Sequence, residues 1–215
     1  MARAGRIRNS TATLHYISMV ERLLVTHNWT RIVHIPYELE RQHDTELASD
    51  SSETMMGAVA RDLEGNAFYI SEVWHEIDSK YVGLHINDKE LLAHIMAVQL
   101  LSQKVGKEYV VVESLVDNTV AGSWVNKLFA KLDDEGGEAQ STRLKWLVDY
   151  AGYQQNRGIV VTTRWIPSEE NVIPDALSRM ESHAHVFDAY AQNILSRGKA
   201  CTRVRVPRSW EPEKA

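Results

Sequence analysis

The strongest constraint on the fold is an unbroken apolar segment, EYVVVESLV at residues 108–116, in which β-branched side chains predominate. Such a run is typical of a strand that is covered on both faces, as the strands of a parallel sheet are. The segment before it, residues 86–106, has apolar residues at helical spacing and ends in Gly106, a favoured residue just after a helix. A buried helix followed by a buried strand predicts an α/β domain.

The neighbouring segments complete the predicted sheet. Short-period runs at 45–52, 55–62 and 66–74, the last two joined by the turn sequence Glu64-Gly65-Asn66, predict a three-stranded antiparallel meander. Helical patterns follow at 119–131 and at about 140–156, and GIVVTTRWIP at 158–167 predicts a fifth strand. The predicted order is βββαβααβ, a mixed five-stranded sheet with helices on both faces.

The charge of the chain is distributed unevenly. Basic minus acidic residues give +4 for residues 1–35 and +4 for 196–215, which leaves −13 for 36–195 and −5 in total. A protein that binds nucleic acid by charge alone would not carry this acidic excess in its main domain, because phosphate would be repelled. Bound divalent cations are one way to offset part of it, and a solvated acidic surface is the other interpretation.

The domain boundaries are expected to follow these differences. Residues 1–44 are predicted to form an N-terminal amphipathic helix, at about 10–27, and a connector. Residues 45–180 form the main domain, and 181–215 are predicted to hold a C-terminal helix to about residue 196 and a basic tail. The tail is expected either to attract nucleic acid by charge or to dock on its own domain.

The sequence also bears on the cellular compartment. A single cysteine, Cys201, excludes an intramolecular disulfide and a zinc site built from cysteines. No apolar stretch approaches the roughly 18 residues of a membrane span, and the start lacks the apolar run of a secretory signal. We therefore expect no membrane partner and an intracellular location, cytoplasmic or nuclear. The start also fits a mitochondrial transit peptide, because it is rich in arginine and hydroxyl residues and has no acid before Glu21.

Four acids stand where the predicted elements end or begin. Asp50 lies near the end of the first strand, Glu90 in the first turns of the buried helix, Asp117 at the end of the next strand and Asp175 after the last strand. Adjacent strands bring their ends together, so these carboxylates are expected to converge. Clustered carboxylates repel each other, and a hard divalent cation offsets that repulsion. Two such cations about 4 Å apart would clamp a phosphodiester.

Four segments around these acids resemble the motifs of the ribonuclease H domain of retroelement reverse transcriptases. They are DSSETMMGAV at 50–59, INDKELLA at 86–93, VDNTVAGSWVNK at 116–127 and WIPSEENVIPDALSR at 165–179. The resemblance spans residues 45–180 approximately, and its most specific part is ENV-x-x-DALSR after a strand. Among retroelements, the motifs are most similar to those of DIRS-like and gypsy-like elements. It implies a ribonuclease H-like fold.

The resemblance also implies a function, namely a metal-dependent endonuclease that cuts the RNA strand of an RNA–DNA hybrid with two Mg²⁺ ions, or with Mn²⁺. By this resemblance Asp50 would bridge both ions, and Asp175 would help to hold the ion that activates water. Glu90 and Asp117 would hold the other ion. The implied partners are the hybrid and a reverse transcriptase polymerase domain in a parent polyprotein, and the implied substrate contacts are Ser51, Asn118 and Arg179.

The sequence departs from the family at two positions. Many relatives have a histidine where Trp165 stands, and Pro174 replaces the alanine before the last aspartate. Pro174 would either displace Asp175 or sit harmlessly in the first turn of a helix.

The same residues also allow other interpretations. Individually, Glu90 could support the N-terminus of its helix, Asn118 could be an N-cap, and Arg179 could pair with nearby acids. The alternative function is a catalytically degenerate ribonuclease H-like scaffold or nucleic-acid-binding domain. An integrase fits less well, because it needs its acids in the order Asp-Asp-Glu. A proofreading exonuclease fits less well, because it places an Asp-x-Glu pair on its first strand, whereas Asp50 is followed by two serines.

Overall fold

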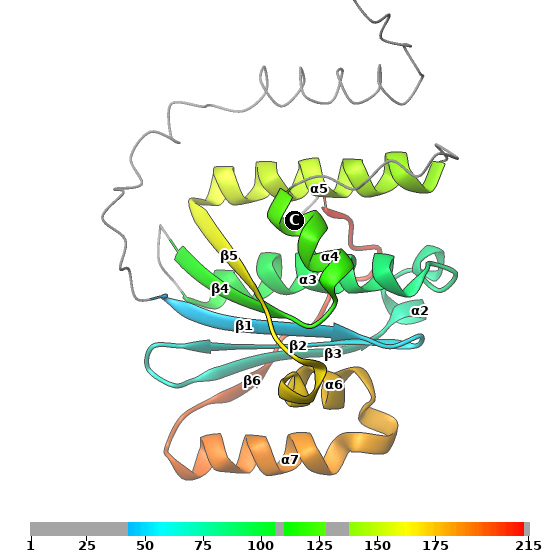
Figure 1. The fold of residues 1–215 in the computed structure, drawn as a ribbon. Coiled ribbons are helices and arrows are strands. Elements are labelled where there is room, and N and C mark those ends of the chain that lie inside the picture. The colour runs from blue at the N-terminus through cyan, green and yellow to red at the C-terminus, as the bar shows by residue number, and fades with distance from the viewer. Residues whose placement is uncertain (1–42, 106–109, 128–137, 213–215) are drawn as a thin grey trace, which may run out of the picture.

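The computed structural model describes residues 43–105, 110–127 and 138–212, so the helix expected at 10–27 and most of the connector lie outside the described residues. Strands and helices form three layers, with the sheet in the middle (Figure 1). The strands are β1 (Thr45–Ser51), β2 (Met55–Asp62), β3 (Ala67–Val73), β4 (Val110–Val116), β5 (Ile159–Trp165) and β6 (Cys201–Arg203). The helices are α2 (Trp74–Ile77), α3 (Ile86–Leu101), α4 (Thr119–Lys127), α5 (Glu138–Arg157), α6 (Val172–Ser178) and α7 (Met180–Ser196). None of the described helices combines the length and the apolar character that crossing a membrane requires.

The strand order β5-β4-β1-β2-β3-β6 confirms the predicted mixed sheet. Strands β1, β2 and β3 form the antiparallel meander, β4 lies parallel beside β1, and β5 lies parallel outside β4. The predicted strand number was wrong, because the described residues form a sheet of six strands and not five. The additional strand, β6, pairs in parallel with β3 and has only three residues, too few to show a periodicity.

Helix α3 is the centre of the larger core, between the sheet and α5 (Figure 1). Leu92, Ile95 and Met96 are fully buried on it, as their spacing predicted. A polar link crosses this core, since the His94 ring lies 3.1 Å from Ser114 Oγ on β4 and 3.0 Å from Tyr150 Oη on α5. Burial lowers the pKa of His94 to about 4, so this ring is neutral at physiological pH.

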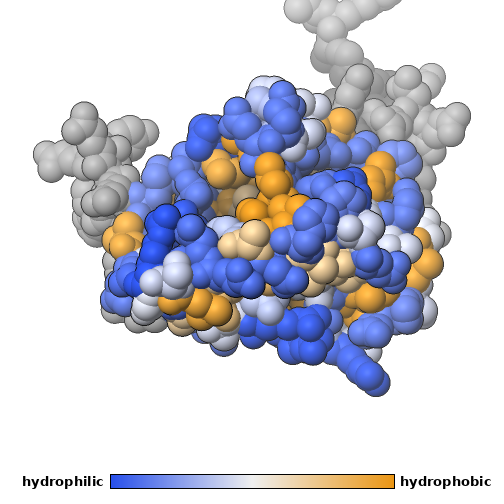
Figure 2. Space-filling model, turned by 90° about the horizontal axis from the view of Figure 1, so that it is seen from below, coloured by the Kyte–Doolittle hydropathy of each residue, from blue (hydrophilic) through white to orange (hydrophobic). Residues whose placement is uncertain are grey.

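Helices α6 and α7 cover the opposite face of the sheet, which confirms helices on both faces. Figure 2 shows the molecule from this side, where hydrophobic residues gather near the centre and hydrophilic ones surround them. Gly57 on β2 allows the close approach of α6, because a Cβ there would lie 2.3 Å from the Pro174 carbonyl oxygen and 2.4 Å from Ser178 N. The contact leaves no space for a side chain.

The segment after α7 docks on the domain, which is one of the two alternatives expected for the basic tail. Val204 and Trp210 are buried in the larger core. Tyr81 Oη donates a hydrogen bond of 2.7 Å to the Trp210 carbonyl oxygen. Arg203 and Arg205 pair with the buried Glu72 at 3.4 and 3.2 Å, so part of the basic charge of the tail is engaged within the domain.

The hydrogen bond from Tyr81 to the docked segment should contribute to the free energy of unfolding. Replacing Tyr81 by phenylalanine should lower the free energy of unfolding by about 1–3 kcal/mol, because the buried Trp210 carbonyl would lose its donor. Tyr190→Phe is the matched control, since the buried Tyr190 hydroxyl has no hydrogen-bond partner among the described residues. Urea denaturation measures both variants, and equal losses in the two would show that the Tyr81 hydrogen bond is not the cause.

Candidate metal centre

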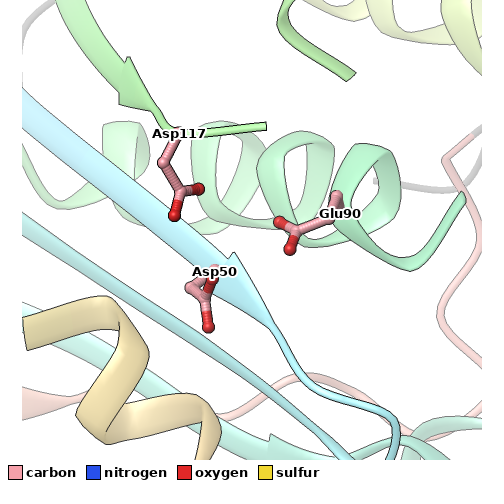
Figure 3. Close-up of side chains that lie close together, drawn as sticks. All are labelled: Asp50, Glu90 and Asp117. Carbon is pink, nitrogen blue, oxygen red and sulfur yellow. The ribbon is translucent and has the colours of Figure 1, made fainter. Parts of the chain in front are cut away.

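Three acidic side chains from separate elements converge at one end of the sheet. Asp50 is the penultimate residue of β1, Asp117 directly follows β4, and Glu90 lies in the second turn of α3. Strands β1 and β4 are parallel neighbours, so their carboxyl ends meet, and α3 packs across β1. One carboxylate oxygen from each acid lies within 4.8 Å of the other two. Figure 3 shows the three side chains lying close together at the end of β1.

The cluster is electrostatically unfavourable without a cation. Burial, followed by the charges of Asp50 and Asp117, raises the pKa of Glu90 to about 9. Burial also raises the pKa of Asp50, and the Asp117 charge adds to this effect, whereas a hydrogen bond from Ser178 opposes it. All the donors are carboxylate oxygens, which are the ligands that Mg²⁺ and Mn²⁺ prefer. The donor set therefore fits a hard divalent cation.

Asp175 lies on the wall of the same site but outside the group of three. It lines an open pocket of about 810 Å³ together with Asp50, Glu90 and Asp117. Its carboxylate forms an ion pair with Arg179, one helical turn along the chain. Pro174 precedes it within the first turn of α6, and the first helical hydrogen bond begins at Asp175 N, so the proline removes no bond from the helix. Pro174 thus lies in the first turn of a helix, as one of the two expectations required, while a displacement of Asp175 stays untested.

The three residues expected to contact substrate all line this pocket, yet each has a partner within the protein. The Asn118 side chain accepts hydrogen bonds from the backbone N–H groups of Val120 and Ala121, at 3.0 and 2.9 Å, and so caps α4. The Ser51 hydroxyl lies 3.3 Å from Trp74 Nε1 and 3.1 Å from the Ser52 carbonyl oxygen. Arg179 pairs with Asp175. These contacts agree with the structural interpretations of Asn118 and Arg179, and a role toward substrate stays a prediction.

Trp165 is fixed beside the acid cluster. Its Nε1 donates a hydrogen bond of 3.0 Å to the Asp117 carbonyl oxygen, while 55% of the residue is exposed. Trp165, which stands where many relatives have a histidine, therefore holds the backbone of the candidate ligand Asp117.

Two residues near the acids were missed by sequence reasoning. Ser178 donates a hydrogen bond to the Asp50 carboxylate from the DALSR segment, where only the aspartate and the arginine were assigned roles. Lys89 precedes Glu90 and is fully buried, and its ammonium group donates to Glu53 through the carbonyl oxygen at 2.7 Å and the carboxylate at 3.1 Å. A lysine within an apolar helix could have signalled such a buried partner, because lysine is rarely buried unpaired.

No family model matches the chain, and no curated protein matches it. Among solved structures, the chain is similar to LC11-RNase H1, isolated from compost by a metagenomic approach, with 18% identity, a TM-score of 0.46, and coverage of 63% of this chain and 93% of that one. It is also similar to the N-terminal RNase H domain of rv2228c from Mycobacterium tuberculosis, with 14% identity, a TM-score of 0.42, and coverage of 62% and 94%. A third similar structure is the foamy viral protease-reverse transcriptase dRH in complex with double-stranded DNA, with 15% identity, a TM-score of 0.38, and coverage of 57% and 20%. At these identities and scores, the similarities carry no conclusion about the function of this chain.

Proposed function

We propose that this protein is a metal-dependent endonuclease of the ribonuclease H type, which cleaves the RNA strand of RNA–DNA hybrids. The observation that carries the proposal is the convergence of Asp50, Glu90 and Asp117 in an open pocket, with ligand oxygens within 4.8 Å of one another. Two divalent cations in such a site would activate a water molecule and stabilise the leaving oxygen of a phosphodiester.

The residues of the pocket would have different roles in binding the two cations. Asp50 is the central ligand, because its carboxylate lies between Glu90 and Asp117 on one side and α6 on the other. Glu90 and Asp117 would help to hold one cation. Asp175 would help to hold the second, in place of its ion pair with Arg179, and the Arg179 guanidinium would then be available to a phosphate of the substrate.

Selectivity for RNA would come from contacts to the 2′-hydroxyl and from the shape of the hybrid. Asn118 stands at the pocket wall next to Asp117, and its side-chain amide also donates a hydrogen bond of 3.1 Å to Asn87. The Asn118 side chain is therefore a polar group at the pocket wall whose position is fixed by these hydrogen bonds. Ser51 would support the metal ligands Asp50 and Glu90. Its backbone N–H interacts with both carboxylates and lowers their pKa values, which favours the charged forms that bind a cation.

The motifs further support a link to retroelement reverse transcriptases of the DIRS-like or gypsy-like kind. On that basis, we propose a polymerase domain as partner and an intracellular location, cytoplasmic or nuclear. The competing function is a degenerate scaffold that keeps the fold without the chemistry. The presence of all four acids around one pocket favours the enzyme.

A substrate panel distinguishes these two functions. The full chain is incubated with end-labelled RNA–DNA hybrid, double-stranded RNA, double-stranded DNA and single-stranded RNA, in Mg²⁺, in Mn²⁺ and in a chelator. We expect cleavage of the RNA strand of the hybrid alone, and only with metal. Binding of the hybrid without cleavage in either metal would contradict the proposed activity and favour the scaffold.

A further inference from the structure

Ser178 occupies an unusual position between the acid cluster and α6. It is the last residue of that helix and is fully buried. Its hydroxyl donates a hydrogen bond to Asp50 Oδ2 and also lies 3.0 Å from the Asp175 carbonyl oxygen, one turn back in the helix. A serine hydroxyl has a single hydrogen, so it can serve only one of these two acceptors at a time.

Other polar contacts fasten α6 and the residue before it to the sheet and to the turn that follows β1. Ser71 Oγ on β3 donates to the Leu177 carbonyl oxygen at 2.8 Å, and Ser52 Oγ donates to the Ser178 carbonyl oxygen at 2.8 Å. Asn171 Nδ2 donates to the Ser49 carbonyl oxygen at 3.1 Å. All of these contacts end on backbone, whereas the Ser178 hydroxyl reaches a carboxylate of the acid cluster.

We propose that Ser178 is a positioning residue of the metal centre, an inference that rests on the proposed function. Its hydroxyl holds the Asp50 carboxylate in one orientation and ties it to the helix that carries Asp175. Ser178 thereby links two candidate ligands that come from opposite ends of the domain sequence.

A pair of matched variants tests this role. Ser178→Ala and Ser71→Ala each remove one buried hydroxyl that fastens α6, but only the first touches a carboxylate. The melting temperature of the full chain is measured over a titration with Mg²⁺, and separately with Mn²⁺, so that metal binding is read without cleavage. Both variants should melt lower than the unmodified protein in the absence of metal.

The expected difference lies in the metal concentration required. Ser178→Ala should need roughly 10-fold more Mg²⁺, or more, to reach half of its maximal melting shift, because partners that orient metal ligands contribute about that much to affinity. Ser71→Ala should keep the midpoint of the unmodified protein. If Ser178→Ala does not fold, Ser178→Cys replaces it, and its weaker donor should give a smaller shift of the midpoint in the same direction.

Several outcomes would overturn the assignment. They are an unchanged or lower midpoint in the Ser178 variant, equal midpoint shifts in both variants, and the absence of any metal-dependent melting shift in the unmodified chain. A chain that binds Mg²⁺ with the expected midpoints but leaves the hybrid uncut would refute the proposed function and keep the assignment of Ser178.

Discussion

Removal of residues 201–215 is expected to unfold the domain or to lower its free energy of unfolding by more than about 3–5 kcal/mol, the usual cost of truncating a single buried tryptophan. Trp210 is 5% exposed and Val204 8%, and both belong to the larger core. The deletion would also expose the edge of β3 that β6 covers. Such a loss is comparable with the whole stability of many domains.

Single substitutions separate burial from charge in this segment. Trp210→Ala should reproduce most of the loss, while Arg208→Ala, which changes an exposed residue of the same segment, should stay within about 0.5 kcal/mol of the unmodified protein. Chemical denaturation followed by circular dichroism measures each value. A deletion variant as stable as the full chain would mean that the segment is a peripheral tail.

Glu90→Gln is expected to stabilise the metal-free protein and to abolish its response to metal. The pKa of Glu90 is raised from 4.5 to about 9 by burial and by the nearby charges of Asp50 and Asp117. The folded chain therefore keeps a proton that the unfolded chain has lost between these two values, and the free energy of unfolding falls as the pH rises from about 4.5 to about 9. Glutamine resembles the protonated side chain and does not titrate.

The variant should therefore lose this part of the pH dependence and be more stable at pH 8 by an amount on the order of a few kcal/mol. Its melting shift with Mg²⁺ should be small, because one of the three clustered carboxylates is gone. Melting curves at pH 5, 7 and 8, with and without Mg²⁺, measure both effects, and Glu76→Gln on α2 serves as an exposed control. If Glu90→Gln were less stable than the unmodified protein at pH 8 without metal, the electrostatic description of the cluster would be wrong.

The sequence predicted the elements whose side chains repeat regularly. The meander, α3 and β4 follow from apolar spacing, and the convergence of Asp50 with Asp117 follows from the neighbouring ends of two strands. Strand β6 could not be predicted, because its three residues carry no period and pair with β3 only through tertiary contact. Tertiary contact also produces the close approach at Gly57, which in the sequence is one glycine within a strand.

The candidate site was predictable only in part, for a related reason. The acids lie at predictable ends of elements, whereas their hydrogen-bond partners are distant in sequence. Ser178 and Asp50 are 128 residues apart, so no local pattern indicates that they touch. The ion pair between Asp175 and Arg179 spans one helical turn and could be expected from spacing once that segment is taken as a helix.

The most direct test of the account compares Asp50→Asn with the unmodified chain in a cleavage assay on labelled RNA–DNA hybrid in Mg²⁺, with hybrid binding measured in parallel. Asp50 is the candidate ligand shared by both cations, so its replacement removes charge from each. We expect the unmodified chain to cut the RNA strand, and we expect Asp50→Asn to fold, to bind the hybrid at least as tightly and to form no product. Cleavage by Asp50→Asn at the rate of the unmodified chain would contradict it.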